Sequence, residues 1–309
     1  MTQNTAFIFP GQGSQTVGML AELTADYPII QATFAEASEA LGFDLWQMVQ
    51  DGPAEALNST ENTQPALLTA SVAIWRAYCE AGGVAPTVMA GHSLGEYSAL
   101  VCAGALKFDD AVKLVALRGR AMQEAVPAGT GAMAAIIGLD DDAIAKACAQ
   151  AAQGEVVSPV NFNSPGQVVI AGHKDAVARA GEACKAAGAK RALPLPVSVP
   201  SHCELMKPAA EKLAAALANI DVVAPAIPVI NNVDVAKADT AEAIKDALVR
   251  QLYCPVRWTE TVNAMAEQGI EQLVECGPGK VLTGLTKRIN KALSGTAVNQ
   301  PADLQALLS

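Results

Sequence analysis

The sequence predicts an α/β protein built on a parallel sheet, with a small subdomain inserted. Of the 309 residues, 51% are hydrophobic and only 4% are aromatic, and a core dominated by Ala, Val and Leu suits helices packed on a parallel sheet. Short apolar runs that stop at Pro or Gly alternate with longer stretches of helical periodicity, which is typical of α/β folds. Residues 126–197 show a different order of predicted strands and helices.

The first 125 residues predict two strands and four helices. Residues 6–9 form an apolar run that ends at Pro10-Gly11, and residues 87–90 form a second run that leads into Gly91-His92-Ser93-Leu94-Gly95. Both read as buried strands followed by tight turns. The helical patterns are 27–41, 65–81, 96–103 and 109–125, the last with Asp109 as its expected cap.

Residues 126–197 predict a β-α-β-β-α-β order. The expected strands are 132–137, 156–161, 168–171 and 191–195, and the expected helices are 140–152 and 175–187. This is the order of a ferredoxin-like unit. We therefore expect a small ferredoxin-like subdomain over 126–197, and a larger α/β subdomain formed by 1–125 and 198–309.

The remainder of the chain returns to the first rhythm. Short strands are expected at 229–230 and 271–276, the second stopped by Gly277-Pro278-Gly279. The expected helices are 204–218, 240–251, 258–268 and one that ends near 289. The last residues show no clear pattern and predict a loosely held tail.

Composition and charge exclude several classes of protein. The formal net charge of −10 repels nucleic acid. Seven cysteines, an odd number without a C-x-x-C pair, favour free thiols in a reducing compartment over a disulfide framework or a zinc site. No apolar run approaches the roughly 18 residues that cross a membrane, and no leader segment is evident. We therefore expect a cytoplasmic protein.

The segment Gly91-His92-Ser93-Leu94-Gly95 matches the G-x-S-x-G pattern of a nucleophile elbow. In α/β-hydrolase-like folds a sharp strand-to-helix turn exposes the serine hydroxyl, and glycines are needed because the turn leaves no room for a Cβ. The backbone N–H after the serine and the helix N-terminus stabilise an oxyanion. A glycine-rich turn with a capping serine is the weaker interpretation, because a strand precedes and a helix follows.

The three histidines, His92, His173 and His202, are the candidate bases for this serine. His92 lies inside the elbow and is expected to brace it, while His173 starts a helix in the small subdomain. His202 follows Val199-Pro200-Ser201, a stiff and uncharged turn, and is the best candidate by elimination. No carboxylate stands out as a third member. A Ser-His pair oriented by a carbonyl or an amide is therefore as well supported as a triad.

Several polar residues stand in apolar surroundings. Arg118 interrupts an apolar helix, and the pattern fits a buried ion pair or a snorkelling side chain as well as a fork for a substrate carboxylate. The loop Gly11-Gln12-Gly13-Ser14 lacks the third glycine of G-x-G-x-x-G and the Gly-Lys-Ser/Thr ending of a P-loop. Because it follows a strand, it could instead donate an N–H to an oxyanion. Gln251, Asn161 and Asn163 carry little meaning alone.

Taken together, the sequence resembles the malonyl-CoA:acyl carrier protein transacylases of bacterial fatty acid synthesis. The resemblance covers nearly the whole chain. It is carried by these segments in this order: Phe9-Pro10-Gly11-Gln12-Gly13-Ser14-Gln15, Gly91-His92-Ser93-Leu94-Gly95-Glu96-Tyr97, Arg118-Gly119-Arg120, Val160-Asn161-Phe162-Asn163-Ser164-Pro165-Gly166, Pro200-Ser201-His202 and Glu275-Cys276-Gly277-Pro278-Gly279.

The resemblance implies a role for each candidate. Ser93 is then the nucleophile and His202 its base, with the N–H groups of Gln12 and Leu94 as the oxyanion hole. Arg118 binds the malonyl carboxylate, which decides between the alternatives above. Gln251 fixes His202 through its backbone carbonyl. The other residues expected at the substrate are Asn161, Asn163 and His92.

The resemblance also implies partners. Malonyl-CoA is the donor, an acidic phosphopantetheinylated acyl carrier protein is the acceptor, and no cofactor or metal is permanently bound. Because this chain is acidic as well, docking needs a local basic patch, for which the candidates are Lys190, Arg191, Lys287 and Arg288. We expect a monomer that binds neither nucleic acid nor membrane. The alternatives are a serine esterase or lipase and a non-catalytic carrier-protein-binding module.

Overall fold

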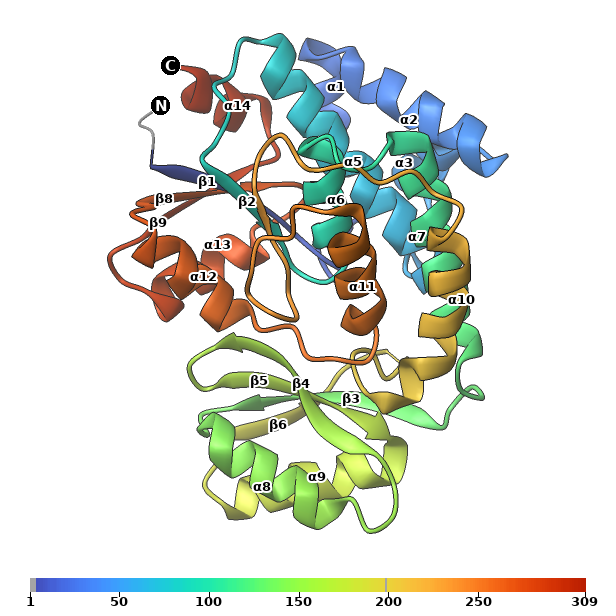
Figure 1. Cartoon of the computed structure of the whole chain (residues 1–309), viewed down its shortest axis with the longest axis vertical. Helices are drawn as coiled ribbons and strands as arrows, with labels where there is room; N and C mark the ends of the chain where they lie inside the picture. Colours follow the sequence, from blue (N-terminus) through green and yellow to red (C-terminus); the bar gives the residue numbers. More distant parts are fainter. Residues whose placement is uncertain (1–3, 198) are drawn as a thin grey trace.

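The computed structural model describes residues 4–197 and 199–309, and within these ranges the chain forms two sheets (Figure 1). The larger sheet is parallel throughout, in the order β7-β2-β1-β8-β9. Its strands are β1 (Thr5–Phe9), β2 (Val88–Gly91), β7 (Val229–Ile230), β8 (Gln272–Cys276) and β9 (Ser294–Val298). The expected α/β fold with a parallel sheet is confirmed.

Both faces of the parallel sheet are covered, which explains why its central strands are continuous apolar runs. Phe7 and Phe9 of β1 face one hydrophobic core, and Ala6 and Ile8 face another. The helices that pack on the Phe7 side are α1 (Ala21–Asp26), α2 (Ile29–Leu41), α3 (Leu45–Asp51), α4 (Ala54–Leu57), α5 (Thr60–Glu80), α6 (Gly95–Cys102), α7 (Phe108–Glu124), α10 (Lys207–Leu217), α11 (Ala241–Gln251) and α14 (Pro301–Leu308). Those on the Ile8 side are α12 (Trp258–Glu267) and α13 (Val281–Ile289).

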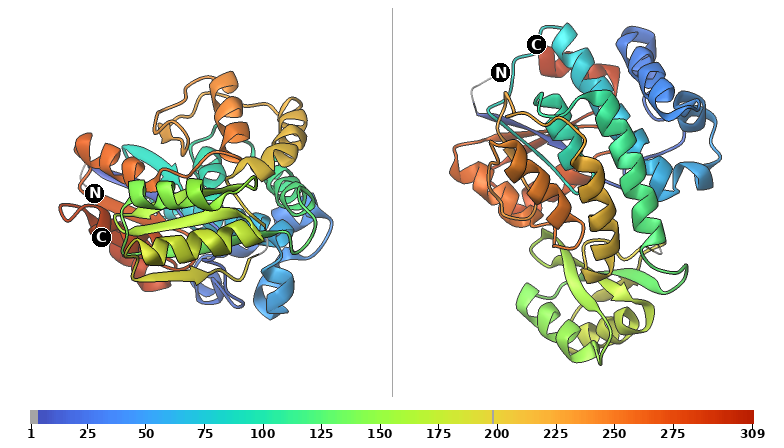
Figure 2. Two further views of the ribbon diagram at one scale, coloured as in Figure 1. Left: turned by 90° about the horizontal axis from the view of Figure 1, so that it is seen from below. Right: turned by 45° about the vertical axis from the view of Figure 1, so that its right-hand side comes forward.

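The second sheet is antiparallel, with the order β4-β5-β3-β6. Its elements are β3 (Gly131–Ile137), α8 (Asp141–Ala151), β4 (Val157–Ser164), β5 (Gln167–His173), α9 (Lys174–Ala186) and β6 (Arg191–Pro194). Helices α8 and α9 cover the face that points away from the parallel sheet, as the view from below shows (Figure 2). The element order is the one expected for residues 126–197.

Strand β4 joins the two sheets. The Phe162 N–H donates to the Val256 carbonyl at 3.0 Å, and the Val256 N–H donates to the Val160 carbonyl at 2.8 Å. The Thr259 hydroxyl also donates to the Phe162 carbonyl, at 3.0 Å. These bonds fix β4 beside the segment that enters α12, so that residues of β4 reach the loops that follow β1 and β2.

The expectation of a loose C-terminal tail is wrong. Strand β9 pairs in parallel with β8, and α14 begins with a capping box between Gln300 and Asp303 and buries Leu304. The sequence did not predict this strand because Ser294-Gly295-Thr296 shows neither an apolar run nor a clean alternation. Its pairing depends on β8, a partner distant from it along the chain.

Other element boundaries also differ from the expectation. Helix α5 begins at Thr60 rather than at Pro65, which lies inside the helix. Asp109 is in the first turn of α7 and not at its cap, which is Lys107. The helix expected from 204 is a 3-10 turn (Glu204–Met206) followed by α10. The short helices α1, α3 and α4 were not expected, because four to seven residues carry too little periodicity.

Three further expectations concern the undescribed residues, membrane-spanning helices and the cysteines. Residues 1–3 and 198, which the sequence assigns to the larger subdomain, lie outside the described residues. Among the described residues, no helix combines the length and apolar character needed to cross a membrane. All seven cysteines are free, and four of them are buried.

Candidate active site

The turn between β2 and α6 presents Ser93 in a strained conformation. Its φ is 52°, in the left-handed region that non-glycine residues rarely occupy. A Cβ on Gly91 would lie 1.9 Å from the carbonyl carbon of Gly95, and a Cβ on Gly95 would lie 2.1 Å from the carbonyl oxygen of Phe9. Neither position admits a side chain, so the expected need for both glycines is confirmed.

His202 is within hydrogen-bond distance of the serine. Its Nε2 lies 2.8 Å from the Ser93 Oγ, and its Nδ1 lies 2.7 Å from the main-chain carbonyl oxygen of Gln251. With Nδ1 donating to that carbonyl, Nε2 is free to accept the serine proton. The imidazole is thus oriented by a backbone carbonyl, as expected for a Ser-His pair rather than a triad. Among the described residues, no carboxylate is hydrogen-bonded to it.

Burial sets the charge state of this histidine. The side chain is 3% exposed, and desolvation, followed by the positive charge of Arg118, lowers the pKa of His202 to about 3. The imidazole is therefore neutral near pH 7, which is the state required of a base.

Arg118 of α7 is buried and points at the same serine. It is 1% exposed. Its guanidinium donates to the side-chain oxygens of Gln64 at 2.8 Å and Gln251 at 2.9 Å, and its Nη2 lies 3.3 Å from Ser93 Oγ. Its Cζ also lies 5.3 Å from the centre of the Tyr97 ring.

The surroundings of Arg118 exclude two of the interpretations left open by its sequence context. No carboxylate of residues 4–197 or 199–309 lies within 4.0 Å of it, and its Nε has no hydrogen-bond partner there. It is therefore neither in a direct ion pair nor snorkelling to solvent. A buried cation without a contacting anion can accept an anionic ligand.

A cavity of about 300 Å³ opens over these groups. Gln12 and Leu94 line it, and neither of their backbone N–H groups has a hydrogen-bond partner in the described part of the chain. An apolar wall is contributed by Leu195, Pro196, Val197 and Val199. The cavity thus brings together a serine hydroxyl, a neutral imidazole, two free N–H donors and a cation.

Strand β4 contributes two asparagines near the elbow. The Oδ1 of Asn163 lies 2.8 Å from the Nε2 of His92, which ties the elbow to the second sheet and is consistent with the bracing role expected of His92. Asn161 and His92 line the cavity, whereas Asn163 is not part of its lining. The Oδ1 of Asn161 is buried and has no hydrogen-bond partner among the described residues, so it can accept a hydrogen bond from a ligand.

The site also contains Glu96 and Asn232, which the sequence analysis did not single out. The Oε2 of Glu96 accepts from the Asn232 N–H at 3.0 Å and from the Gln251 Nε2 at 2.8 Å. Asn232 Oδ1 accepts from the Ser93 N–H at 2.8 Å, and its Nδ2 donates to the Gly91 carbonyl at 2.7 Å. Glu96 lies three residues after the serine on the inward face of the elbow helix, and Asn232 closely follows β7. Neither residue type marks its position as part of the site in the sequence, because only tertiary contacts bring Glu96 and Asn232 together.

The remaining candidates lie elsewhere. His173 accepts a hydrogen bond at Nδ1 from the Val156 N–H, within the second sheet. Lys190, Arg191 and Arg288 line one groove between the second sheet and α13, and Lys287 is exposed next to Arg288. Three of the four predicted docking residues are thus brought together from two separate segments.

The chain is similar to known proteins over nearly its whole length. The family model described as acyl transferase domain matches residues 6–301. A malonyl CoA-acyl carrier protein transacylase of Escherichia coli (strain K12) is 70% identical over 308 residues, which cover 100% of this chain and 99% of that protein.

Two solved structures are equally similar. An acyl carrier protein S-malonyltransferase from Vibrio cholerae is 70% identical with a TM-score of 0.97, over 98% of this chain and 99% of that one. A malonyl-transacylase in complex with a type II PKS acyl-carrier protein is 66% identical with a TM-score of 0.98, over 98% of both chains.

Proposed function

The chain belongs to the malonyl CoA-acyl carrier protein transacylase family, and from this premise we propose that it works through a malonyl-Ser93 intermediate. The reaction moves malonyl from malonyl-CoA to the phosphopantetheine thiol of acyl carrier protein, in fatty acid synthesis. One observation carries the proposal: the Ser93–His202 pair, 2.8 Å apart, lies beside a buried arginine 3.3 Å from the same Oγ.

In the first half-reaction Ser93 attacks the thioester carbonyl of malonyl-CoA while its proton passes to His202 Nε2. The oxyanion accepts hydrogen bonds from the N–H groups of Gln12 and Leu94, each worth roughly 3 kcal/mol of barrier. The carbon–sulfur bond then breaks, and the departing CoA thiolate takes the proton from His202.

The second half-reaction reverses these roles with a different thiol. The carrier thiol gives its proton to His202 as its sulfur attacks the malonyl-Ser93 ester. The Ser93 oxygen leaves and takes the proton back, which restores the free enzyme. This is a ping-pong transfer, and it requires no permanently bound cofactor.

Arg118 selects the acyl group. A malonyl carboxylate can fill the position beside the guanidinium, where the buried charge has no contacting anion. An acetyl group cannot, and leaves that desolvated cation unpaired. Asn161, with its free buried Oδ1, and His92 complete the wall around the substrate.

The architecture supports a division of labour. We assign residues 1–125 and 198–309 to an α/β-hydrolase-like subdomain that carries the nucleophile, and 126–197 to a ferredoxin-like subdomain that covers it. The second sheet and its two helices have a hydrophobic core of their own, which favours this division. The groove lined by Lys190, Arg191 and Arg288 is the proposed docking surface for the acidic carrier protein. The free thiols suit an enzyme in the cytoplasm, where we propose that it acts as a monomer.

The test is intact mass spectrometry of the protein mixed with malonyl-CoA, before and after addition of phosphopantetheinylated carrier protein. The expected result is one malonyl adduct on Ser93 that persists in water and moves to the carrier thiol, and no adduct on the Ser93→Ala variant. An adduct that hydrolyses at once would show an esterase instead. No adduct at all would reject the covalent mechanism.

A further inference from the structure

Two buried charges in the site are separated by a single amide group. Arg118 and Glu96 are 1% and 2% exposed, and neither makes a direct ion pair within 4.0 Å in the described chain. The Gln251 amide lies between them: its Oε1 accepts from Arg118 at 2.9 Å and its Nε2 donates to Glu96 at 2.8 Å. The cation and the anion thus fix the amide in one orientation, because a flipped amide would oppose both charges.

The same residues hold the reacting groups. The main-chain carbonyl of Gln251 accepts from His202, and its Nε2 also lies 3.0 Å from the Ser93 carbonyl oxygen. Glu96 further accepts from the N–H of Asn232, whose Oδ1 holds the Ser93 N–H. Displacement at Glu96 would therefore reach the serine, the histidine and the arginine through one or two hydrogen bonds.

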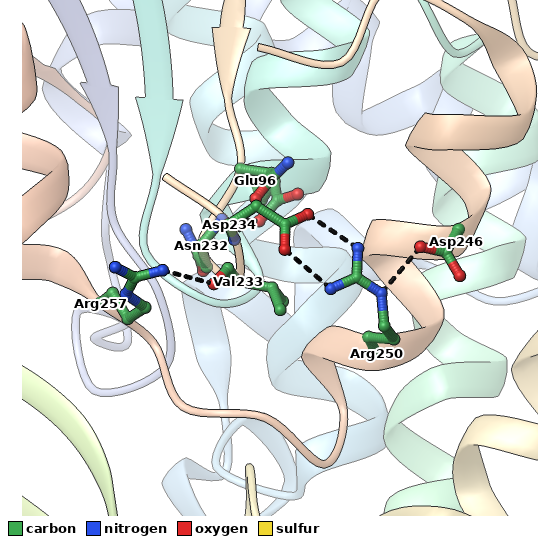
Figure 3. Close-up of polar contacts among 8 residues, drawn as sticks. Glu96, Asn232, Val233, Asp234, Asp246, Arg250 and Arg257 are labelled. Carbon is green, nitrogen blue, oxygen red and sulfur yellow. Dashed lines mark hydrogen bonds and ion pairs between the residues drawn. The ribbon is translucent and has the colours of Figure 1, made fainter. Parts of the chain in front are cut away.

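The loop that carries Asn232 is anchored from outside the site. Figure 3 shows Asp234 of this loop bound by both terminal nitrogens of Arg250, which also contacts Asp246 of α11. Arg257 donates to the Val233 carbonyl at 3.1 Å. Glu96 therefore meets a fixed backbone donor, and its carboxyl cannot relax away from Gln251 without breaking this contact.

We infer that Glu96 is the buried counter-charge of Arg118: through the Gln251 amide it positions the site and sets how strongly Arg118 binds an acyl carboxylate. The inference rests on the proposed function, because it needs a malonyl carboxylate at Arg118. It predicts an electrostatic link. When that carboxylate arrives, the site holds two negative charges for one positive charge, and Glu96 relieves the excess by taking a proton from solvent.

The neighbouring groups leave Glu96 as the group that titrates near neutral pH. Desolvation raises the pKa of Glu96 to about 7. The charged or titratable groups that face it are Arg118 from α7, Tyr97 on its own helix and Asp234 from the loop after β7, with His202 beyond Gln251. Burial raises the pKa of Tyr97 to about 12, and Arg250 lowers the pKa of Asp234, so neither changes charge between about pH 5.5 and pH 8.5.

The decisive experiment is calorimetric titration of the non-reacting Ser93→Ala protein with malonyl-CoA and, separately, with acetyl-CoA, in buffers of different ionisation enthalpy. At about pH 8 the binding of malonyl-CoA should be accompanied by the uptake of about 0.3 to 1 proton more per site than the binding of acetyl-CoA. Acetyl-CoA is the reference because it shares the CoA phosphates but has no carboxylate. This excess proton uptake should vanish when Glu96→Gln is combined with Ser93→Ala, and it should persist when Glu275→Gln is combined with Ser93→Ala. Glu275 is a matched control: a buried carboxyl whose partners are Leu282 and Thr283.

The affinity should follow the same pattern. At about pH 8.5 Glu96→Gln should bind malonyl-CoA roughly three- to tenfold more tightly, because one repulsive charge is removed. Near pH 5.5, where Glu96 is already neutral, the difference should disappear. If the protein with both Ser93→Ala and Glu96→Gln does not fold, the pH dependence of malonyl-CoA affinity in Ser93→Ala alone still tests the inference. Equal proton uptake with both ligands, or uptake that survives Glu96→Gln, would overturn the inference.

The positioning role has its own readout in the reactive enzyme. Glu96→Ala removes the acceptor for Gln251 and should lower kcat about 10- to 100-fold for both malonyl and acetyl transfer, because His202 loses its alignment. Glu96→Gln keeps an acceptor and should restore kcat. Equal losses in both variants would reject this role. If the wild type forms the malonyl adduct on Ser93 but the Glu96 variants behave like the wild type, only this inference is rejected. If the wild type forms no adduct, the proposed function is rejected.

Discussion

At the residue scale, the site depends on groups whose burial changes their chemistry. Ser93 and His202 were predicted from their own sequence context, a serine between glycines and a histidine in an uncharged turn. For Arg118, an arginine in an apolar helix, that context left several roles open, and only the resemblance to the family assigned it to the substrate carboxylate. Glu96 was not predicted, because a glutamate on a helix is ordinarily solvated. Only the tertiary contacts with Asn232 and Gln251 show that it is buried.

Arg118→Ala should lower kcat/KM for malonyl transfer by roughly 100-fold and that for acetyl transfer far less, because only malonyl uses the charge-assisted hydrogen bonds. Both activities are measured with the same carrier protein. Arg120→Ala is the matched control, since this neighbour is exposed and only weakly paired with Glu61 at 3.7 Å. Equal losses for malonyl and acetyl would refute the role of Arg118 as a carboxylate clamp.

His202 predicts an unusual pH profile. Because burial and Arg118 lower its pKa to about 3, the imidazole stays neutral on acidification through its ordinary value near 6.5. The single-turnover rate of Ser93 malonylation at saturating malonyl-CoA should therefore be nearly constant from about pH 8 to pH 5, and fall only near pH 4 and below. Quenched-flow mass spectrometry measures this rate. An inflection near pH 6.5 would show a solvated histidine.

At the scale of elements, local signals were reliable where a short segment determines its own geometry. The elbow was predicted because its G-x-S-x-G pattern lies within one short segment, and Gly91 is required by a contact inside that turn. Strand β9 was not predicted because its own residues show no strand pattern, and its pairing with β8 across α13 is not visible in them. The β-α-β-β-α-β order of 126–197 was predicted because each strand and helix there has its own clear periodicity.

The elbow glycine gives a test with a built-in contrast. Gly95→Ala should destabilise the protein by about 2–4 kcal/mol and abolish adduct formation, because the added Cβ would lie 2.1 Å from the Phe9 oxygen. Gly284→Ala in α13, where an added Cβ meets no heavy atom within 4 Å, should stabilise it by about 0.5–1 kcal/mol. Urea unfolding measures both. Similar effects from the two changes would contradict the close packing of the elbow.

At the scale of the whole molecule, the site exists because two sheets meet. The parallel sheet supplies Ser93, Arg118 and Gln251 through the helices that follow its strands, and the antiparallel sheet supplies Asn161 and the segment leading to His202. Strand β4 fixes the second sheet to the first at Val256. Sequence periodicity predicted both parts but contains no information about this contact, which is why the cavity could not be predicted.

The overall charge leads to the last prediction. The chain carries a net charge of −10, so an acidic carrier protein needs a local basic surface, and the proposed one is the groove lined by Lys190, Arg191 and Arg288. Charge reversal of Lys287 and Arg288 to Glu should raise KM for the carrier protein roughly tenfold and leave KM for malonyl-CoA unchanged. Lys113→Glu, an exposed change on α7, is the control.

Ionic strength separates docking from general repulsion in this experiment. Because the attraction at the groove is short-ranged and screened by salt, KM for the carrier protein should rise with salt in the wild type and lose that dependence in the reversed variant. If the groove plays no part, salt should instead weaken the repulsion between two acidic proteins and lower KM in both variants. The sign of the salt effect therefore shows which field governs the approach of the carrier protein.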